Sequence, residues 1–442
     1  MRILQVSKFL HYVGGVETYF RWLAPRQQAQ GHDVAIVGMQ PPVGHHLMQE
    51  LAALPRWTTK TRSYEKGSPQ RLRSAMTSMW SREAGEVMET AITDFRPDLI
   101  HFHGTCYQLT PAVAKAAANR GVPAVLTAHE YKLACANQTL YDDVAADICT
   151  ACIGASRFSK VTEPLSRNCM KGSRLVTALG AAEGLISDFT WRHVDPVVLA
   201  PSKFMRRALI EDGWPPGRIE YLDLPWCPAG LSVQCPDTER NTVVFLGRLV
   251  ALKGVHRLLN AWEQIHSRHP DVELRILGDG ADGPGLVARA SALPQVTFLG
   301  QVSPQTVRAE LSRALLSVHP SQCHENSPYA VRESLMAGVP ALVSDVGGMP
   351  DMVGPETGWV VPHDSDVAWA EGLSTAIDHA RPGARALREA VIARATTEED
   401  HLDSLSRAYD TAQNQRGTAV PPSRPTRPMF HRLSAKIVAQ QG

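Results

Sequence analysis

Residues 319–348 read HPSQCHENSPYAVRESLMAGVPALVSDVGG, and this stretch is the most informative about the fold. A short apolar run over 315–319 predicts a buried strand that leads into a polar loop. The next segment predicts a helix that begins at Pro328 with Ser327 as its N-cap, because proline at a helix start loses no needed donor. The helix ends before 341–344, where an apolar run predicts the next strand. This order is typical of an open α/β sheet, in which ligands bind in loops that follow the strands.

Two glutamates flank the start of this predicted helix. Glu325 lies in the loop, and Glu333 lies inside the helix. The free amides and the positive dipole end of a helix N-terminus suit a phosphate. An extended ligand with an anionic middle and hydroxyls at both ends, such as a nucleotide sugar, would therefore fit. The alternative is that both are surface glutamates without a ligand.

The composition indicates a globular protein of more than one domain. The chain has 442 residues, which suits two or three domains. Its 44% hydrophobic and 20% charged residues are ordinary, and a net charge of +1 gives no reason to expect a nucleic-acid partner. No apolar run approaches the ~20 residues of a membrane span. The opening MRILQVSKFL predicts a strand rather than a signal peptide, so we expect a cytoplasmic protein.

Paired glycines follow the first predicted strand, which covers residues 2–6. Gly14 and Gly15 stand between that strand and a helix predicted to run through about residue 30. Because glycine has no side chain, backbone amides at such a turn can approach a phosphate closely. A tight strand-to-helix turn also uses glycine, so the pattern leaves both interpretations open.

Two histidines stand directly after predicted buried strands. His103 follows the strand at 98–102, and His129 follows the strand at 124–127. A single histidine of this kind is more often structural. Two of them at neighbouring strand ends favour a role in the ligand crevice.

Four cysteines predict a structural zinc site in a loop-rich segment. They are Cys135, Cys149, Cys152 and Cys169, and the middle pair forms the CxxC motif CTAC. Reduced thiols or a redox-labile disulfide are the alternatives. Because four thiolates would close the coordination shell, we expect no catalytic role for such a metal.

A second run of strand, loop and helix begins at residue 242, and its loop carries two cations. Arg248 and Lys253 stand between Gly247 and Gly254. Arginine offers a planar fork and lysine a point charge, so together they can clamp a phosphate. A solvated basic loop is the alternative interpretation.

The two runs predict two Rossmann-like domains with a cleft between them. We expect a first domain at 1–225, a linker at 226–240, a second domain at 241–395, a final helix at 396–415 and a basic, disordered tail at 416–442.

Two segments of the chain are strongly basic. Residues 56–73 contain six Lys and Arg against one acid, and residues 416–442 contain basic residues and prolines without an acid. Both segments could be solvated surface. The functional interpretation is a surface for an anionic acceptor or for membrane headgroups at the inner face of the membrane.

At this point the motifs resemble those of a known family, the retaining glycosyltransferase family 4, which has the GT-B fold of two Rossmann-like domains facing across a cleft. The resemblance covers nearly all of residues 1–415. It implies that the first domain is the acceptor side, that the second binds the nucleotide sugar, and that the final helix packs back on the first domain. Glu325, seven residues and Glu333, followed by SLMAGVPALVSDVGG, look like the E-x7-E motif of the family and the segment after it. GRLVALKG and GGVETYF look like its two phosphate-type loops. LTAHEYKLAC with the later CxxC resembles a subgroup that carries a cysteine cluster.

The resemblance implies catalytic roles for four residues. Arg248 and Lys253 would hold the donor diphosphate and stabilise it as it leaves, without a metal or other cofactor at the reacting centre. Glu325 would position the donor sugar and assist electrostatically, and His129 would lie beside that sugar. The reaction implied is transfer of a sugar, of the hexose type, with retained anomeric configuration.

The resemblance also implies a larger set of donor-binding residues. Glu333 would bind the ribose hydroxyls, and Gln301 and Val302 would meet the base. The remaining members are Gly14, Gly15, His103, Ser327, Pro328, Tyr329 and Ala330. The chain departs from the family at 326–328, where Asn-Ser-Pro replaces the usual Gly-Phe-Gly.

The expected donor is a UDP or GDP sugar. The expected acceptor is a hydroxyl of a glycan, a lipid-linked saccharide or a small molecule, as in glycan biosynthesis. Two alternatives stay open: a nucleotide-sugar epimerase or phosphorylase on the same fold, and a non-catalytic nucleotide-sugar-binding scaffold.

Overall fold

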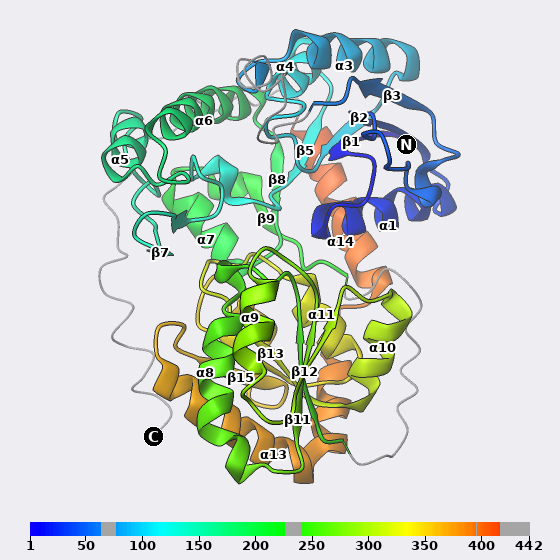
Figure 1. Cartoon of the computed structure of the whole chain (residues 1–442). Helices are drawn as coiled ribbons and strands as arrows, with labels where there is room; N and C mark the ends of the chain where they lie inside the picture. Colours follow the sequence, from blue (N-terminus) through cyan, green and yellow to red (C-terminus); the bar gives the residue numbers. More distant parts are fainter. Residues whose placement is uncertain (63–76, 226–239, 395, 416–442) are drawn as a thin grey trace. The chain divides into compact units, whose positions relative to one another are not determined.

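The computed structural model describes residues 1–62, 77–225, 240–394 and 396–415 (Figure 1). Within these ranges the chain forms two compact units. The first contains residues 1–200, 205–221 and the chain from 406 onward, and the second contains 201–204 and 222–405. The predicted linker, the tail at 416–442 and most of the basic stretch at 56–73 lie outside the described residues.

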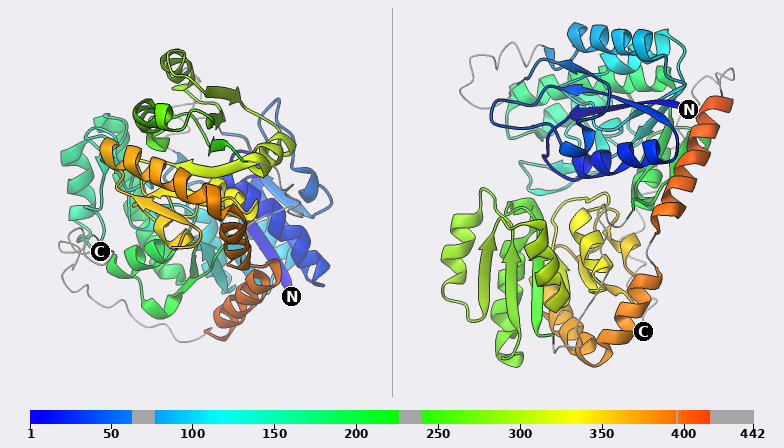
Figure 2. Two further views of the ribbon diagram at one scale, coloured as in Figure 1. Left: turned by 90° about the horizontal axis from the view of Figure 1, so that it is seen from below. Right: turned by 90° about the vertical axis from the view of Figure 1, so that its right-hand side faces the viewer.

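A seven-stranded parallel sheet forms the centre of the first unit, in the order β3-β2-β1-β4-β5-β8-β9. Its strands are β1 (Arg2–Phe9), β2 (Asp33–Met39), β3 (Arg56–Thr59), β4 (Leu99–Phe102), β5 (Ala124–Thr127), β8 (Val197–Ala200) and β9 (Ile219–Tyr221). The strands are short and largely buried, because helices lie on both faces of the sheet (Figures 1 and 2). The sequence predicted β5 and β8 with these bounds.

The helices of the first unit are α1 (Gly15–Ala29), α3 (Arg82–Phe95), α4 (Ala112–Asn119), α5 (Ser159–Arg167), α6 (Arg174–Val194) and α7 (Lys203–Glu211), with short 3-10 turns η1 (Gln49–Leu51), η2 (Tyr131–Leu133) and η3 (Pro216–Arg218). Serine caps start two of them, because Ser81 and Ser173 accept a hydrogen bond from the amide three residues later. The strands β6 (Tyr141–Asp142) and β7 (Asp147–Ile148) pair as a separate antiparallel hairpin.

The second unit has a six-stranded parallel sheet in the order β12-β11-β10-β13-β14-β15. Its strands are β10 (Thr242–Leu246), β11 (Glu273–Leu277), β12 (Val296–Gly300), β13 (Ala314–His319), β14 (Ala341–Ser344) and β15 (Gly358–Val361). One apolar cluster around Trp262 and Trp369 packs its helices against the sheet.

The helices of the second unit are η4 (Ala251–Lys253), α8 (Val255–Ile265), η5 (His266–Arg268), α9 (Gly283–Ala290), α10 (Pro304–Arg313), α11 (Tyr329–Met336), α12 (Met349–Met352) and α13 (Asp366–Ala393). The last helix, α14 (Glu398–Asn414), contributes residues to both units.

Both sheets have the strand order of a doubly wound Rossmann fold. In such a sheet the strand order reverses at the first strand, which creates a crevice at the carboxyl ends of two neighbouring strands. That point lies between β1 and β4 in the first sheet and between β10 and β13 in the second. Among the predicted site residues, the loops after these four strands contain Gly14, His103, Arg248, Lys253 and Glu325. No helix in the described part of the chain is long and apolar enough to cross a membrane.

Candidate functional site

A lysine and a glutamate form an ion pair at the reversal point of the second sheet. Lys253, at the end of the loop after β10, contacts Glu325 Oε1 in the loop after β13. Ser321 Oγ donates to the same oxygen at 3.1 Å. The structure thus brings together two residues that the sequence placed 72 positions apart.

Glycines let the loops at this point approach each other closely. Gly254 has a φ of 68° and Gly347 a φ of 64°, which other residues rarely adopt. A Cβ on Gly254 would collide with the Pro320 carbonyl, and one on Gly347 with the backbone of Glu325. The Gly348 amide also donates to the Glu325 carbonyl at 2.7 Å. Backbone packing therefore fixes the main chain at Glu325.

The Glu325 carboxylate is ionised at neutral pH. Its burial alone would raise the pKa, but the ammonium of Lys253 and the hydrogen bonds from Lys253 and Ser321 outweigh burial and lower the pKa of Glu325. Neighbouring His319 is buried, and burial followed by the Lys253 charge lowers its pKa to about 3. The site therefore combines an anionic Glu325, a cationic Lys253 and a neutral His319.

The second predicted cation, Arg248, is exposed in the same loop. Its positive charge helps to lower the pKa of Glu325, so the two side chains lie within electrostatic range. The loop is held by the Leu249 amide, which donates to the Asp279 carbonyl at 2.9 Å, and by the Gln322 amide, which donates to the Leu252 carbonyl at 2.8 Å. Arg248 and Lys253 thus extend from one anchored loop, as a phosphate clamp requires.

The start of α11 differs from the prediction. Pro328 is itself the N-cap, with extended backbone, and Tyr329 is the first helical residue. The prediction that Ser327 caps the helix is wrong, because its hydroxyl instead accepts a hydrogen bond from Arg332 Nε at 2.8 Å. Glu333 lies half-buried within α11, as expected.

Arg332 is a structural residue that the sequence analysis missed. Its side chain is buried and donates to the Leu224 carbonyl and to Asp223 Oδ1, both at 2.6 Å. Asp223 also accepts from Thr396 Oγ1 at 2.5 Å. A buried arginine must be paired, so Arg332 ties the start of α11 to residues on both ends of the second unit. An arginine within the apolar run YAVRESLMAGV was the available signal.

At the reversal point of the first sheet, the side chain of a glutamate accepts a hydrogen bond from an amide at the start of α1. Gly14 is the N-cap of α1, and its amide donates to Glu17 Oε2 at 2.9 Å. Burial raises the pKa of Glu17. The backbone of Gly14 is extended and a Cβ there would meet nothing within 4 Å, so neither φ nor packing requires glycine at this position. Gly15 is the first helical residue.

The two predicted histidines lie next to each other. His103 Nδ1 is 3.3 Å from His129 Nε2, at the carboxyl ends of β4 and β5. Lys8 pairs with Glu130 at 2.7 Å beside them. Lys132, in the same segment, forms a fully buried pair with Glu183 of α6. The loop after β5 is therefore fixed by ion pairs.

The four cysteines of the predicted zinc site are free thiols. Burial, followed by the other three cysteines, raises the pKa of Cys152 to about 12. Because such electrostatic effects act only at short range, the four cysteines lie near one another. Even so, no group of three or more His, Cys, Asp or Glu in the described ranges is arranged to hold a metal ion. Zinc thus stays a prediction of the sequence, which metal analysis of the purified protein would test.

The predicted base contacts follow β12. Gln301 is exposed, and Val302 packs partly on the apolar cluster around Val244 and Leu277. The amide of Gly278, after neighbouring β11, donates to the Gly300 carbonyl at 2.8 Å.

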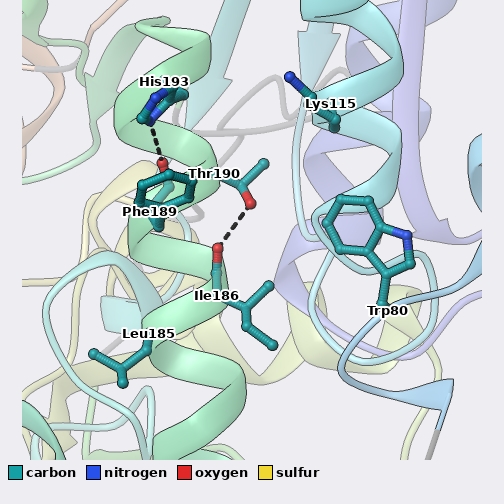
Figure 3. Close-up of a pocket in the computed structure, with 7 residues that line it drawn as sticks. All are labelled: Trp80, Lys115, Leu185, Ile186, Phe189, Thr190 and His193. Atoms are coloured by element: carbon teal, nitrogen blue, oxygen red, sulfur yellow. Dashed lines mark hydrogen bonds between the residues drawn. The ribbon is translucent and has the colours of Figure 1, made fainter.

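A pocket of about 360 Å³ lies away from all of these residues, on the surface of α6 (Figure 3). Leu185, Ile186 and Phe189 of α6 line it together with Trp80. Lys115 and His193 lie at its border, and Phe189 is 52% exposed. This pocket contains none of the predicted site residues.

Comparisons with known proteins identify both halves of the chain. Residues 14–225 match the glycosyl transferase 4-like domain, and residues 233–397 match the glycosyl transferases group 1 family. The chain is thus built from two glycosyltransferase domains, and its fold is of the GT-B type.

Individual relatives agree with this class. A GDP-mannose-dependent alpha-mannosyltransferase of Mycolicibacterium smegmatis is 31% identical over 41% of this chain and 44% of its own length. A D-inositol 3-phosphate glycosyltransferase of Corynebacterium glutamicum is 30% identical over 39% of this chain and 41% of its own. Both matches span less than half of the relative. The solved sucrose-phosphate synthase of Thermosynechococcus elongatus superposes with a TM-score of 0.63 at 18% identity, covering 93% of this chain and 99% of that one.

Proposed function

We propose that the protein is a retaining glycosyltransferase that moves a hexose from a UDP or GDP sugar to a hydroxyl acceptor. The observation that carries this proposal is the Lys253–Glu325 pair at the reversal point of the second sheet, with Arg248 on the same loop. The two glycosyltransferase domain matches supply its general class.

In this proposal the cations act on the leaving group. Arg248 gives a planar fork and Lys253 a compact charge, which together can neutralise a diphosphate as the bond to the sugar breaks. Glu333 would accept hydrogen bonds from the ribose, and the helix start at 327–330 would offer its amides to a phosphate. Gln301 and Val302 would meet the base.

Glu325 would act as an anion. A lowered pKa means that it has no proton to give at neutral pH, so it can accept hydrogen bonds from sugar hydroxyls and stabilise positive charge on the reacting carbon. A glycosidase would instead need one carboxylic acid with a raised pKa. Glu325 therefore does not suit the role of that general acid. His129 would lie beside the sugar, with His103 behind it.

Isothermal titration calorimetry with UDP, GDP, ADP and TDP tests the donor site. We expect one diphosphate to bind, and we expect Arg248→Ala and Lys253→Ala each to weaken binding by about tenfold or more, which corresponds to ~1.4 kcal/mol. Arg381→Ala is the matched control, because this exposed arginine pairs with Asp271 elsewhere in the same unit. Failure of all four nucleotides to bind would refute the proposal.

Transfer assays with the bound nucleotide's sugars then distinguish an enzyme from a scaffold. A product with the anomeric configuration of the donor, determined by NMR, supports the retaining mechanism. An inverted product would exclude it, and an epimerised free nucleotide sugar would favour the epimerase alternative.

We also propose peripheral contact with an anionic membrane, through exposed side chains of α6 and of the start of α5. Phe158, Leu175 and Phe189 are 77%, 70% and 52% exposed, which is unusual for large apolar side chains. Exposed Arg157 and Arg174 adjoin them, and the Arg157 guanidinium lies 6.0 Å from the Phe189 ring. Apolar groups bordered by cations suit the headgroup region of an anionic bilayer. Within the basic segment at 56–73, Arg62 pairs with Glu83, and residues 63–73 lie outside the described part of the chain.

A further inference from the structure

A chain of buried polar side chains runs along one face of the first sheet. Its members come from the strands, from α1 and from α14, and each is at most 3% exposed. In order they are His103, Gln5, Gln27, Tyr409, His101 and Thr127. Gln5 and His101 are register partners on β1 and β4, so their side chains project to the same face. Buried polar groups are costly unless they are hydrogen-bonded, and here each is bonded to the next.

The hydrogen bonds that link these buried side chains run in one direction, from donor to acceptor. His103 Nε2 is 2.6 Å from Gln5 Oε1, and Gln5 Nε2 donates to Gln27 Oε1 at 2.6 Å. Gln27 Nε2 then donates to the Tyr409 hydroxyl at 2.7 Å. That hydroxyl lies 2.8 Å from His101 Nδ1. Because amide oxygens only accept and amide nitrogens only donate, the two glutamines set this direction.

The direction of these hydrogen bonds determines which ring nitrogen of His103 carries the proton. Burial, followed by the neighbouring histidines His101 and His129, lowers the pKa of His103 well below its ordinary value, so the ring is neutral and holds one proton. That proton is on Nε2, because Nε2 lies against the Gln5 oxygen. His103 Nδ1 can therefore only accept a hydrogen bond.

The same logic applies to His129, whose Nε2 lies 3.3 Å from His103 Nδ1. Since His103 Nδ1 accepts, His129 Nε2 must carry a proton. Burial lowers the pKa of His129 to about 4, so its ring is also neutral at pH 7. Its lone pair is consequently on Nδ1.

We propose that Gln5, held in orientation by Gln27 and Tyr409, is a positioning residue that fixes His129 in the tautomer with its proton on Nε2 and its lone pair on Nδ1. In that tautomer Nδ1 can accept a hydrogen bond but cannot donate one. A substrate group that meets this nitrogen would therefore be a hydroxyl, such as that of a sugar, rather than a carbonyl or phosphate oxygen. This selection rests on the proposed function, whereas the tautomer itself does not.

Nitrogen-15 NMR of the full-length, histidine-labelled protein without substrate tests the tautomer, because protonated and unprotonated ring nitrogens resonate at clearly different shifts. Comparison with His129→Gln assigns the signal. We expect His129 to be protonated on Nε2 from pH 6 to 8. Protonation on Nδ1 in the unmodified protein would overturn the proposal without any variant.

Two substitutions of Gln5 test its role. Gln5→Met keeps the length of the side chain but removes the acceptor for His103 Nε2, so the His129 signal should move towards the Nδ1-protonated form. Gln5→Glu, protonated in this buried setting, can still accept from His103 and donate to Gln27, so the native tautomer should persist. An unchanged His129 tautomer in a folded Gln5→Met protein would contradict the proposal.

Kinetics provide a separate measurement once a donor and an acceptor are known. Gln5→Met should lower kcat by about tenfold, with little change in the KM for the donor, whose diphosphate binds elsewhere, and Gln5→Glu should restore kcat. Equal kcat values in the native protein, Gln5→Met and Gln5→Glu would show that the His129 tautomer does not affect catalysis. Absence of any transfer activity would refute the proposed function but leave the NMR result standing.

Discussion

At the residue scale, the second unit holds the ion pair of Lys253 and Glu325 within electrostatic range of a neutral histidine, His319. His319 remains neutral because burial and Lys253 both disfavour its protonated form. Protonation of His319 would place a second cation beside Lys253 and weaken its attraction to Glu325. The same electrostatics that suit this loop for an anion therefore make it sensitive to acid.

His319→Asn should reveal this sensitivity in urea unfolding. The folded-state pKa of about 3 lies below the unfolded value of 6.5, so the unfolded state takes up a proton first as the pH falls. The stability that neutral His319 contributes is complete above pH 6.5 and is lost between pH 6.5 and 3. At pH 5 the loss is roughly 2 kcal/mol. The stability difference between the native protein and His319→Asn should shrink by that amount from pH 7.5 to pH 5.

The control for this measurement is His46→Asn, because His46 is exposed. Its stability difference from the native protein should stay constant over the same pH range. A constant difference for His319→Asn as well would show that His319 is not held neutral.

At the element scale, turns and helix faces decide what the loops can do. The loop after β10 approaches the loop after β13 because Gly254 adopts a left-handed conformation against the Pro320 carbonyl. In the first unit, α6 leaves the apolar side chains of Leu175 and Phe189 exposed. Each feature supports one prediction.

Gly254→Ala should destabilise the second unit by about 2 kcal/mol or more, because a left-handed alanine is strained and its Cβ meets a carbonyl oxygen. It should also weaken nucleotide binding, since Lys253 would be displaced. Gly285→Ala in α9 is the matched control: its Cβ meets nothing within 4 Å, so stability should rise by about 0.5–1 kcal/mol. Calorimetric unfolding measures both, and equal effects would contradict the packing argument.

Phe189→Glu should reduce sedimentation with vesicles that contain an anionic phospholipid. Loss of one buried aromatic side chain corresponds to ~1.5–3 kcal/mol, or at least a tenfold lower partition coefficient. Vesicles of zwitterionic lipid alone should bind the native protein more weakly, because the cations around Phe189 have no partner there. Val287→Glu, on exposed α9, should leave vesicle binding unchanged. Equal binding by the native protein and Phe189→Glu would exclude this surface.

At the scale of the whole molecule, the last helix completes the first unit although it is the most distant in sequence. Tyr409 of α14 is buried and bonds to Gln27 and His101, 382 and 308 positions away. The part of α14 up to residue 405 belongs to the second unit and the rest to the first, so one helix contributes residues to both units.

Tyr409→Phe should therefore destabilise the first unit while its ring still fills the same space. The Gln27 amide loses its buried acceptor, which costs roughly 1–3 kcal/mol. Tyr12→Phe is the control, because Tyr12 is 60% exposed and its change should stay within ~0.5 kcal/mol. Differential scanning calorimetry should show a lower transition temperature only for Tyr409→Phe, and equal temperatures for the two variants would contradict the buried chain.

The sequence by itself determined the two parallel sheets and the loops that carry the site. Apolar runs, glycines and prolines are local signals, so β5, β8 and β14 were predicted with the bounds observed. The strand ends then placed Glu325, Lys253, His103 and His129 near the reversal points, because in parallel sheets these loops share one edge.

Only the tertiary structure decided which side chains pair. The Ser327 cap was wrong because the buried Arg332, five residues further on, uses that hydroxyl. Arg332 is itself held by Leu224 and Asp223, 108 and 109 positions away, and nothing in the local sequence specifies those contacts. The path from His103 through Gln5 to Tyr409 likewise depends on packing between remote elements, whereas the Glu17 carboxylate at the Gly14 amide is a local contact between residues three positions apart. Burial then sets the charge of each group, because removal of water changes pKa values by an amount that residue spacing does not encode.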